Sequence, residues 1–187
     1  MLNGDTVALR ARLEADVAVL HAELYEDVPT RVRADQRAWM PLGVSSSPYA
    51  VKDRPAAGSK FAAEFSVVER ATGDLAGEAV LWRMDRHNRS AHVGLALRPA
   101  FRGRGLSIAV LHALAKFGLD ILGLNRLQLE TTADNAAMLA AASRAGYRRE
   151  GVLRQSAWVD GAFVDEVVMS VLAAERLRPE LRTAPPA

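Results

Sequence analysis

One stretch limits the fold of this chain more than any other, because a strand pattern, a proline, a glycine-rich basic turn and an apolar helix follow one another within residues 95–122. The turn and the start of the helix have the sequence Arg102-Gly103-Arg104-Gly105-Leu106-Ser107. The free N–H groups at a helix start, the positive end of the helix dipole and nearby arginines together make an anion site. Glycine lets the backbone approach such a ligand because it has no Cβ. The stretch therefore predicts a phosphate or pyrophosphate site.

Two well-known phosphate-binding loops do not fit this turn. No Lys-Ser/Thr pair follows Gly105, as a Walker A loop requires, and the third glycine of the dinucleotide-binding fingerprint is missing. A tight turn with solvated arginines is the structural alternative, and it stays open at this point.

The length and composition favour a single globular domain. A chain of 187 residues can bury a sizeable core. We expect one domain over residues 1–177 and a disordered tail over residues 178–187. The formal net charge is only +2 and does not favour a nucleic-acid partner, and no apolar run reaches membrane-spanning length.

The chain has no cysteine, which excludes a disulfide framework, a thiolate metal site and a catalytic thiol. The four histidines form no close cluster in the sequence, so we expect no bound metal. The first residues lack the basic and apolar regions of a signal peptide. We therefore expect a cytoplasmic protein.

Hydrophobic periodicity divides the chain into strands and helices. The pattern predicts strands at 6–10, 61–69, 75–84, 90–98 and 125–132, helices at 14–26, 30–40, 105–122 and 134–144, and a final hairpin of 147–159 and 162–172. We expect Pro41 to end the second helix and Asp134 to cap the last one. Residues 43–58 are rich in turn formers, and we expect this loop to act as a lid over a bound substrate.

The strand before the glycine-rich turn and the strand after the following helix are expected to be neighbours. A strand–helix–strand unit of this length places its two strands parallel. The other strands are joined by short turns, which favour antiparallel pairing. We therefore expect an α+β fold (an α/β three-layer arrangement): a mixed, mostly antiparallel central sheet flanked by helices, with one parallel pair near residues 91–97 and 126–132.

The sequence resembles the GNAT superfamily of N-acetyltransferases over about residues 5–173. The turn is similar to the family's acyl-CoA loop, Gln/Arg-x-x-Gly-x-Gly/Ala, with Arg102 and Gly105 matched and Ser107 in the last place. Residues 127–135, the following helix and Ala145-Gly146-Tyr147 are similar to the family's second cofactor segment. Residues 147–165 resemble the RimJ/RimL-like branch, which includes enzymes that acetylate the N-termini of ribosomal proteins.

The resemblance implies acetyl-CoA as co-substrate and an amine acceptor as partner. It implies that the parallel pair splays after Leu97, and that the exposed backbone there bonds the pantetheine amides through Leu95, Ala96 and Leu97. The pyrophosphate would be held by the N–H groups of Arg102, Gly103, Arg104, Gly105, Leu106 and Ser107. Asn135 looks like the family's pantetheine-contacting asparagine; its alternative role is to stabilise the start of its own helix. A homodimer is one option for the assembly.

Acetyl transfer to an amine needs a base for the ammonium proton. The resemblance favours Glu130, which lies five residues before Asn135, and alternation places it on one face of its strand with Gln128. We expect partial burial to raise the pKa of Glu130 toward neutrality, so that Glu130 and not His92 governs the pH dependence. Its structural alternative is an ion pair with a nearby arginine. His92 is the rival base because histidine titrates near neutral pH, and its alternative is a structural role.

The other two groups of the reaction are less well defined. The resemblance implies the backbone N–H near Leu97 as oxyanion donor. The general acid is missing, because Ala142 stands where some relatives have Tyr and Met138 where others have Ser, while the adjacent Ser143 faces another way. The leading function is direct acetyl transfer from acetyl-CoA to a primary amine, of a protein N-terminus or a small molecule, in a ternary complex. A non-catalytic acyl-CoA-binding module, or a transferase of another acyl group, stays open.

Overall fold

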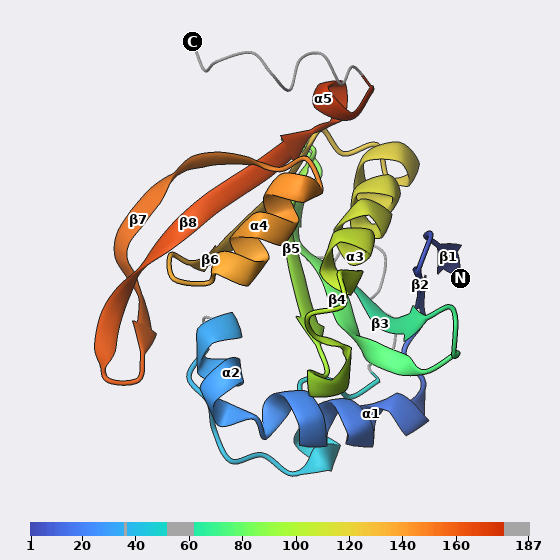
Figure 1. The fold of residues 1–187 in the computed structure, drawn as a ribbon, viewed down its shortest axis with the longest axis vertical. Coiled ribbons are helices and arrows are strands. Elements are labelled where there is room, and N and C mark those ends of the chain that lie inside the picture. The colour runs from blue at the N-terminus through green and yellow to red at the C-terminus, as the bar shows by residue number, and fades with distance from the viewer. Residues whose placement is uncertain (36, 52–61, 178–187) are drawn as a thin grey trace.

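The computed structural model describes residues 1–35, 37–51 and 62–177, and its centre is one eight-stranded sheet (Figure 1). The strand order is β1-β2-β3-β4-β5-β6-β8-β7. The strands are β1 (Leu2–Asn3), β2 (Val7–Arg10), β3 (Ala63–Glu69), β4 (Leu75–Asp85), β5 (Ser90–Leu97), β6 (Arg126–Thr132), β7 (Arg148–Val159) and β8 (Ala162–Leu172). All neighbours pair antiparallel except β5 and β6, which are parallel. The predicted mixed sheet with one parallel pair is confirmed.

Helices lie on both sides of the sheet (Figure 1). They are α1 (Glu14–Leu20), α2 (Val28–Ala34), α3 (Leu106–Ala115), α4 (Ala136–Arg144) and α5 (Ala173–Leu177). A π-helical turn extends α1 over His21–Tyr25, and another extends α3 over Lys116–Ile121. Short 3-10 turns cover Val44–Ser46 and Pro99–Phe101. Among the helices of the described residues, none is both long and apolar enough to cross a membrane.

The main core lies between the sheet and α3. Leu127 and Leu129 of β6 are almost fully buried and belong to one apolar cluster with Leu111 and Leu114 of α3. Burying one such leucine contributes about 1.5–3 kcal/mol. Because side chains alternate along a strand, the even-numbered residues of β6 face the other side of the sheet. The core therefore fixes which β6 side chains remain for chemistry.

Several predicted boundaries were wrong. The second helix ends at Ala34 and not near Pro41, because Asp35 is extended and its carboxylate accepts a hydrogen bond from the Arg37 N–H. The cap of α4 is Asn135, one residue after the predicted Asp134. The short β1 and α5 were not predicted. Part of the proposed lid, residues 52–58, and the predicted tail at 178–187 lie outside the described residues.

The parallel pair is much shorter than either of its strands. Residue pairs join Ser90 to Arg126, Ala91 to Leu127 and His92 to Gln128, and the pairing then stops. The expected divergence after Leu97 was therefore placed five residues too late. β5 stays paired with β4 and β6 stays paired with β8, so the twist between these two antiparallel groups separates β5 from β6.

Candidate functional site

The divergence of β5 from β6 leaves a backbone edge beyond His92 that is not paired with β6. This edge includes Leu95, Ala96 and Leu97, the three residues expected to bond pantetheine. The carbonyl of Leu97 accepts a hydrogen bond of 2.9 Å from Nε of Arg102, so this acceptor is already used by the protein. The remaining edge has the geometry to accept an extended ligand as an added strand.

The glycine-rich turn follows this edge directly and ends at the N-terminus of α3. Gly103 and Gly105 have φ values of +72° and +77°, in the left-handed region that favours glycine. A Cβ placed at either residue would meet no atom within 4 Å. The first N–H groups of α3 have no partner within the helix, and Ile108 begins the ladder by donating to the Gly105 carbonyl. These residues fit a pyrophosphate, because there is open space around both glycines and the first N–H groups of α3 have no partner in the helix.

The side chains of the two arginines of the turn each pair with a carboxylate of the protein. Arg102 pairs with Asp27 at 3.2 Å, at the start of α2, and Arg104 pairs with the buried Glu69 at the end of β3. Both arginines keep part of their side chains exposed. The ion pairs fix the shape of the turn, and backbone donors are left as its main anion-binding groups.

Asn135 takes the capping role that was its structural alternative. Its side-chain oxygen accepts a hydrogen bond of 3.1 Å from the Met138 N–H, and its amide nitrogen donates to Oγ1 of Thr131 at 3.0 Å. An asparagine amide has a second N–H and its oxygen a second lone pair. A ligand contact can therefore add to the cap without replacing it.

The two rival bases lie together at the point where β5 and β6 separate. Nδ1 of His92 is 3.2 Å from Oε2 of Glu130, and both side chains are largely buried. The ring of His92 packs on Trp82 of β4, with ring centroids 5.1 Å apart. Burial raises the pKa of Glu130, but hydrogen bonds from His92 and Gln128 outweigh it and hold the pKa below its usual range. The expected upward shift was therefore wrong.

The pair continues into a polar row that the sequence analysis missed. Nε2 of Gln128 donates to Oε1 of Glu130 at 2.5 Å, and Arg126 donates to Oε1 of Gln128 at 2.6 Å. Arg126 also pairs with Glu150 of β7. The signal was available in the sequence, since positions 126, 128 and 130 alternate with the buried leucines of β6.

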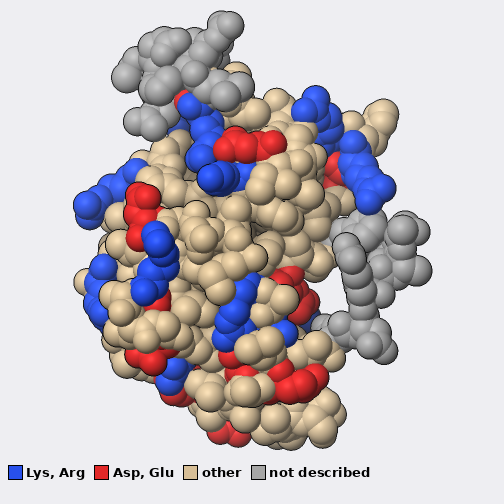
Figure 2. Space-filling model, turned by 90° about the vertical axis from the view of Figure 1, so that its right-hand side faces the viewer, with Lys and Arg blue, Asp and Glu red and all other residues tan. Residues whose placement is uncertain are grey.

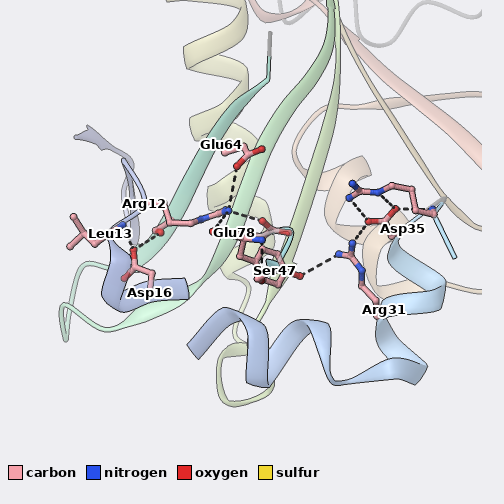
Figure 3. Close-up of polar contacts among 11 residues, drawn as sticks. Arg12, Leu13, Asp16, Arg31, Asp35, Ser47, Glu64 and Glu78 are labelled. Carbon is pink, nitrogen blue, oxygen red and sulfur yellow. Dashed lines mark hydrogen bonds and ion pairs between the residues drawn. The ribbon is translucent and has the colours of Figure 1, made fainter. Parts of the chain in front are cut away.

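A second polar cluster lies close to α1 and α2 (Figure 3). It is on the same face of the sheet as His92, because Glu78 is opposite Ala96 of β5, four residues after His92. Arg12 is buried and pairs with Glu78 at 2.9 Å and with Glu64 at 3.4 Å. Burial raises the pKa of Glu78 more than Arg12 lowers it. Tyr49 packs under Arg12, with 5.5 Å between the guanidinium carbon and the ring centroid. This cluster ties the loop at Tyr49 to β3 and β4.

On α4, no side-chain hydroxyl stands at the two positions that were considered for a general acid. Ala142 is fully buried, Met138 packs against the core, and the neighbouring Ser143 is exposed.

Positive and negative side chains are interspersed on the face drawn in Figure 2. Within the described residues, no group of three or more His, Cys, Asp or Glu is arranged to hold a metal ion.

Comparison with known proteins gives related sequences and folds. Residues 6–148 match the family described as Acetyltransferase (GNAT) domain. The "Putative ribosomal N-acetyltransferase YdaF" of Bacillus subtilis (strain 168) is 31% identical over 103 residues, which cover 55% of this chain and 56% of that protein. A spermidine N(1)-acetyltransferase of Vibrio cholerae serotype O1 is 24% identical over 111 residues, covering 59% of this chain and 64% of that protein. The matched regions thus span less than two thirds of these relatives.

Solved structures share the whole fold. The crystal structure of spermidine N-acetyltransferase from Vibrio cholerae in complex with CoA and spermine superposes with a TM-score of 0.75 at 16% identity, over 92% of this chain and 99% of that chain. At this identity the likeness concerns the arrangement of strands and helices.

Proposed function

Because the chain belongs to the GNAT acetyltransferase family, we propose that it transfers an acetyl group from acetyl-CoA to a primary amine in a ternary complex. The observation that carries the proposal is the open left-handed turn at Gly103 and Gly105. It lies between an unpaired strand edge and the start of α3, where an anionic and extended ligand finds donors along its whole length.

Each part of the site has a task in this proposal. The edge from Leu95 to Leu97 bonds the pantetheine arm, with Asn135 on the opposite side. The N–H groups from Arg102 to Ser107 hold the pyrophosphate, and the pair of His92 and Glu130 takes up a proton from the acceptor. Acetyl-CoA supplies the thioester: its carbonyl carbon gains a C–N bond and loses the C–S bond, and of the two protons leaving the ammonium one ends on sulfur and one in water.

The acceptor class follows from the relatives only in general terms. One relative is named for ribosomal N-acetylation and another for spermidine, and both acceptors are primary amines. We also propose that the chain belongs to the RimJ/RimL-like branch, which residues 147–165 resemble. We propose that it acts in the cytoplasm. A homodimer stays a prediction.

The cofactor test uses two glycines of the same conformation. Asparagine tolerates the left-handed region better than most residues, so Gly105→Asn mainly adds a side chain to the cradle. We expect it to weaken acetyl-CoA binding at least about tenfold, which is about 1.4 kcal/mol. It should also abolish the rise in melting temperature that acetyl-CoA gives the wild type. Isothermal titration and thermal melts measure both.

Gly161→Asn is the matched control. Gly161 has φ +84° and also has open space around it, but it lies in the turn between β7 and β8, and within the described residues no hydrogen bond or ion pair joins that turn to residues 102–107. Binding that is unchanged in Gly105→Asn, or lowered equally in both variants, would contradict the cofactor site. A thioester-cleavage assay with a panel of amines then separates a transferase from a binding module, which would bind acetyl-CoA without turnover. Other acyl-CoA donors belong in the same assay.

A further inference from the structure

We infer that Nε2 of His92 is the base of the proposed reaction, and that Glu130, Gln128 and Arg126 are positioning residues that fix the protonation of its ring. The inference rests on the proposed function and deepens it. It replaces the sequence-based preference for Glu130 as the base. His92 and Glu130 are thus not rival bases, because they take different roles in one hydrogen-bonded row across β5 and β6.

The donor and the acceptor of each hydrogen bond in the row are determined, because Arg126 at one end can only donate. Arg126 carries five N–H donors and no acceptor, so the Gln128 atom that it meets must be the amide oxygen. The amide nitrogen of Gln128 then faces Glu130 and donates to Oε1. Arg126 is itself held by Glu150 on β7, so the start of the row is anchored to the edge of the sheet.

The contact with Glu130 determines which ring nitrogen of His92 carries the proton. Glu130 is an ionised acceptor, so Nδ1 of His92 must carry the proton in the 3.2 Å contact. In a neutral ring the lone pair is then on Nε2. Among the residues that the structure describes, Nε2 of His92 has no hydrogen-bond partner.

Position and surroundings favour the ring over the carboxylate as the base. Both oxygens of Glu130 already accept hydrogen bonds, from Gln128 and from His92, and its pKa is lowered. His92 is the last residue of β5 that pairs with β6, so its ring lies at the apex of the divergence. The charged groups around the pair are Arg83 on β4, Arg126 on β6 and Glu150 on β7.

In this arrangement Nε2 takes one proton from the acceptor ammonium, directly or through one water. The ring becomes a cation whose Nδ1–H is held by Glu130. The charge on the ring is thus met by a carboxylate at 3.2 Å, and the ring later returns its proton to water.

The direction of the row can be reversed by exchanging two residues. In Glu130→Gln, Gln128 still donates to the oxygen at position 130, so the new amide nitrogen faces Nδ1 and moves the ring proton to Nε2. In the double variant Gln128→Glu/Glu130→Gln, the carboxylate at position 128 accepts from Arg126 and from the amide at position 130. The amide oxygen then faces His92 and restores the proton on Nδ1.

Nitrogen-15 NMR of the histidine rings reads this proton directly, with His92→Gln identifying the His92 signals. We expect the proton on Nδ1 in the wild type, on Nε2 in Glu130→Gln, and again on Nδ1 in the double variant. A wild-type ring with its proton on Nε2, or a ring unaffected by Glu130→Gln, would overturn the positioning role. Thermal melts and acetyl-CoA titration check that each variant is folded.

Kinetics supply the second readout. The variants His92→Gln and Glu130→Gln should each lower kcat/KM by about two to four powers of ten. His92→Gln should also remove the rise of kcat/KM with pH. The double variant should recover at least about tenfold over Glu130→Gln, since tenfold corresponds to about 1.4 kcal/mol of transition-state stabilisation. If Glu130 is the base, the double variant stays as slow as Glu130→Gln, and His92→Gln keeps the pH profile.

The two levels of proposal fail separately. Absence of acetyl transfer to every amine, with the expected ring protonation in all three proteins, would overturn the proposed function and the role of His92 as base. The positioning role of Glu130 and Gln128 would then stand. An unexpected ring protonation in an active enzyme would overturn the inference alone.

Discussion

Asp16 lies in the first turn of α1 and is one of the few buried carboxylates among the described residues, with 4% of the residue exposed. Burial raises its pKa, but hydrogen bonds from Arg10, the Leu13 N–H and the Ser66 hydroxyl bring it down to about 2. Three donors from three segments therefore meet at one ionised group. The charged form of Asp16 holds the start of α1 against β2 and β3.

This carboxylate makes a prediction about acid stability. Because its folded pKa lies below the unfolded value, its contribution is complete above about pH 4 and is lost as the pH falls toward 2. The shift corresponds to roughly 2 kcal/mol. Asp16→Asn should lower the free energy of unfolding by about that amount at pH 7, and the difference from wild type should shrink below pH 4. Urea denaturation at several pH values measures it; a difference independent of pH would contradict the assignment.

Residue identity was easier to predict than residue partnership. The alternation along β6 correctly placed Gln128 and Glu130 on one face. The contact between His92 and Glu130 was not predicted, because the two residues are 38 positions apart and their contact depends on the register of β5 and β6. The ion pairs of Arg102 and Arg104 were missed for the same reason, since Asp27 and Glu69 are far away in the sequence.

At the scale of elements, the apolar periodicity located the central strands and helices well and their ends less well. The predicted helix over 105–122 is an α-helix over Leu106–Ala115 followed by a π-helical turn over Lys116–Ile121. The end of α2 depends on Asp35, a polar residue whose effect comes from the arginines around it. The apolar pattern thus predicts an element, while polar side-chain contacts at its end decide where it stops.

The cap of α4 makes a prediction about one element. Asn135→Ala should lower the free energy of unfolding by about 1 kcal/mol, because the Met138 N–H loses its acceptor. Asn135→Ser keeps a neutral cap but removes the amide. If Asn135 also contacts pantetheine, both variants weaken acetyl-CoA binding, while only the alanine variant is clearly less stable. Denaturation curves and titrations separate the two effects; full affinity in Asn135→Ser would mean a purely structural residue.

At the scale of the molecule, the sheet consists of two groups of strands joined at three residue pairs. β1 to β5 form one group, and β6, β8 and β7 form the other. A ligand between the groups should hold them together, so acetyl-CoA should slow amide hydrogen exchange in Val93–Leu97 and in residues 103–107. The far end of the β7–β8 hairpin serves as control and should not change. Protection confined to other regions would contradict binding between the strands.

The two strand groups are also continuous in the sequence, since residues 2–97 supply the first and residues 126–172 the second. β5 and β6 are neighbours across the two groups, and every other pair of neighbouring strands lies within one group. The exposed turn around Ile121 and Leu122 lies between them. A cut in the backbone there should leave two fragments that reassemble through α3 and the three parallel residue pairs of β5 and β6. Acetyl-CoA should promote this reassembly. The fold should thus tolerate a break in the chain at this exposed turn.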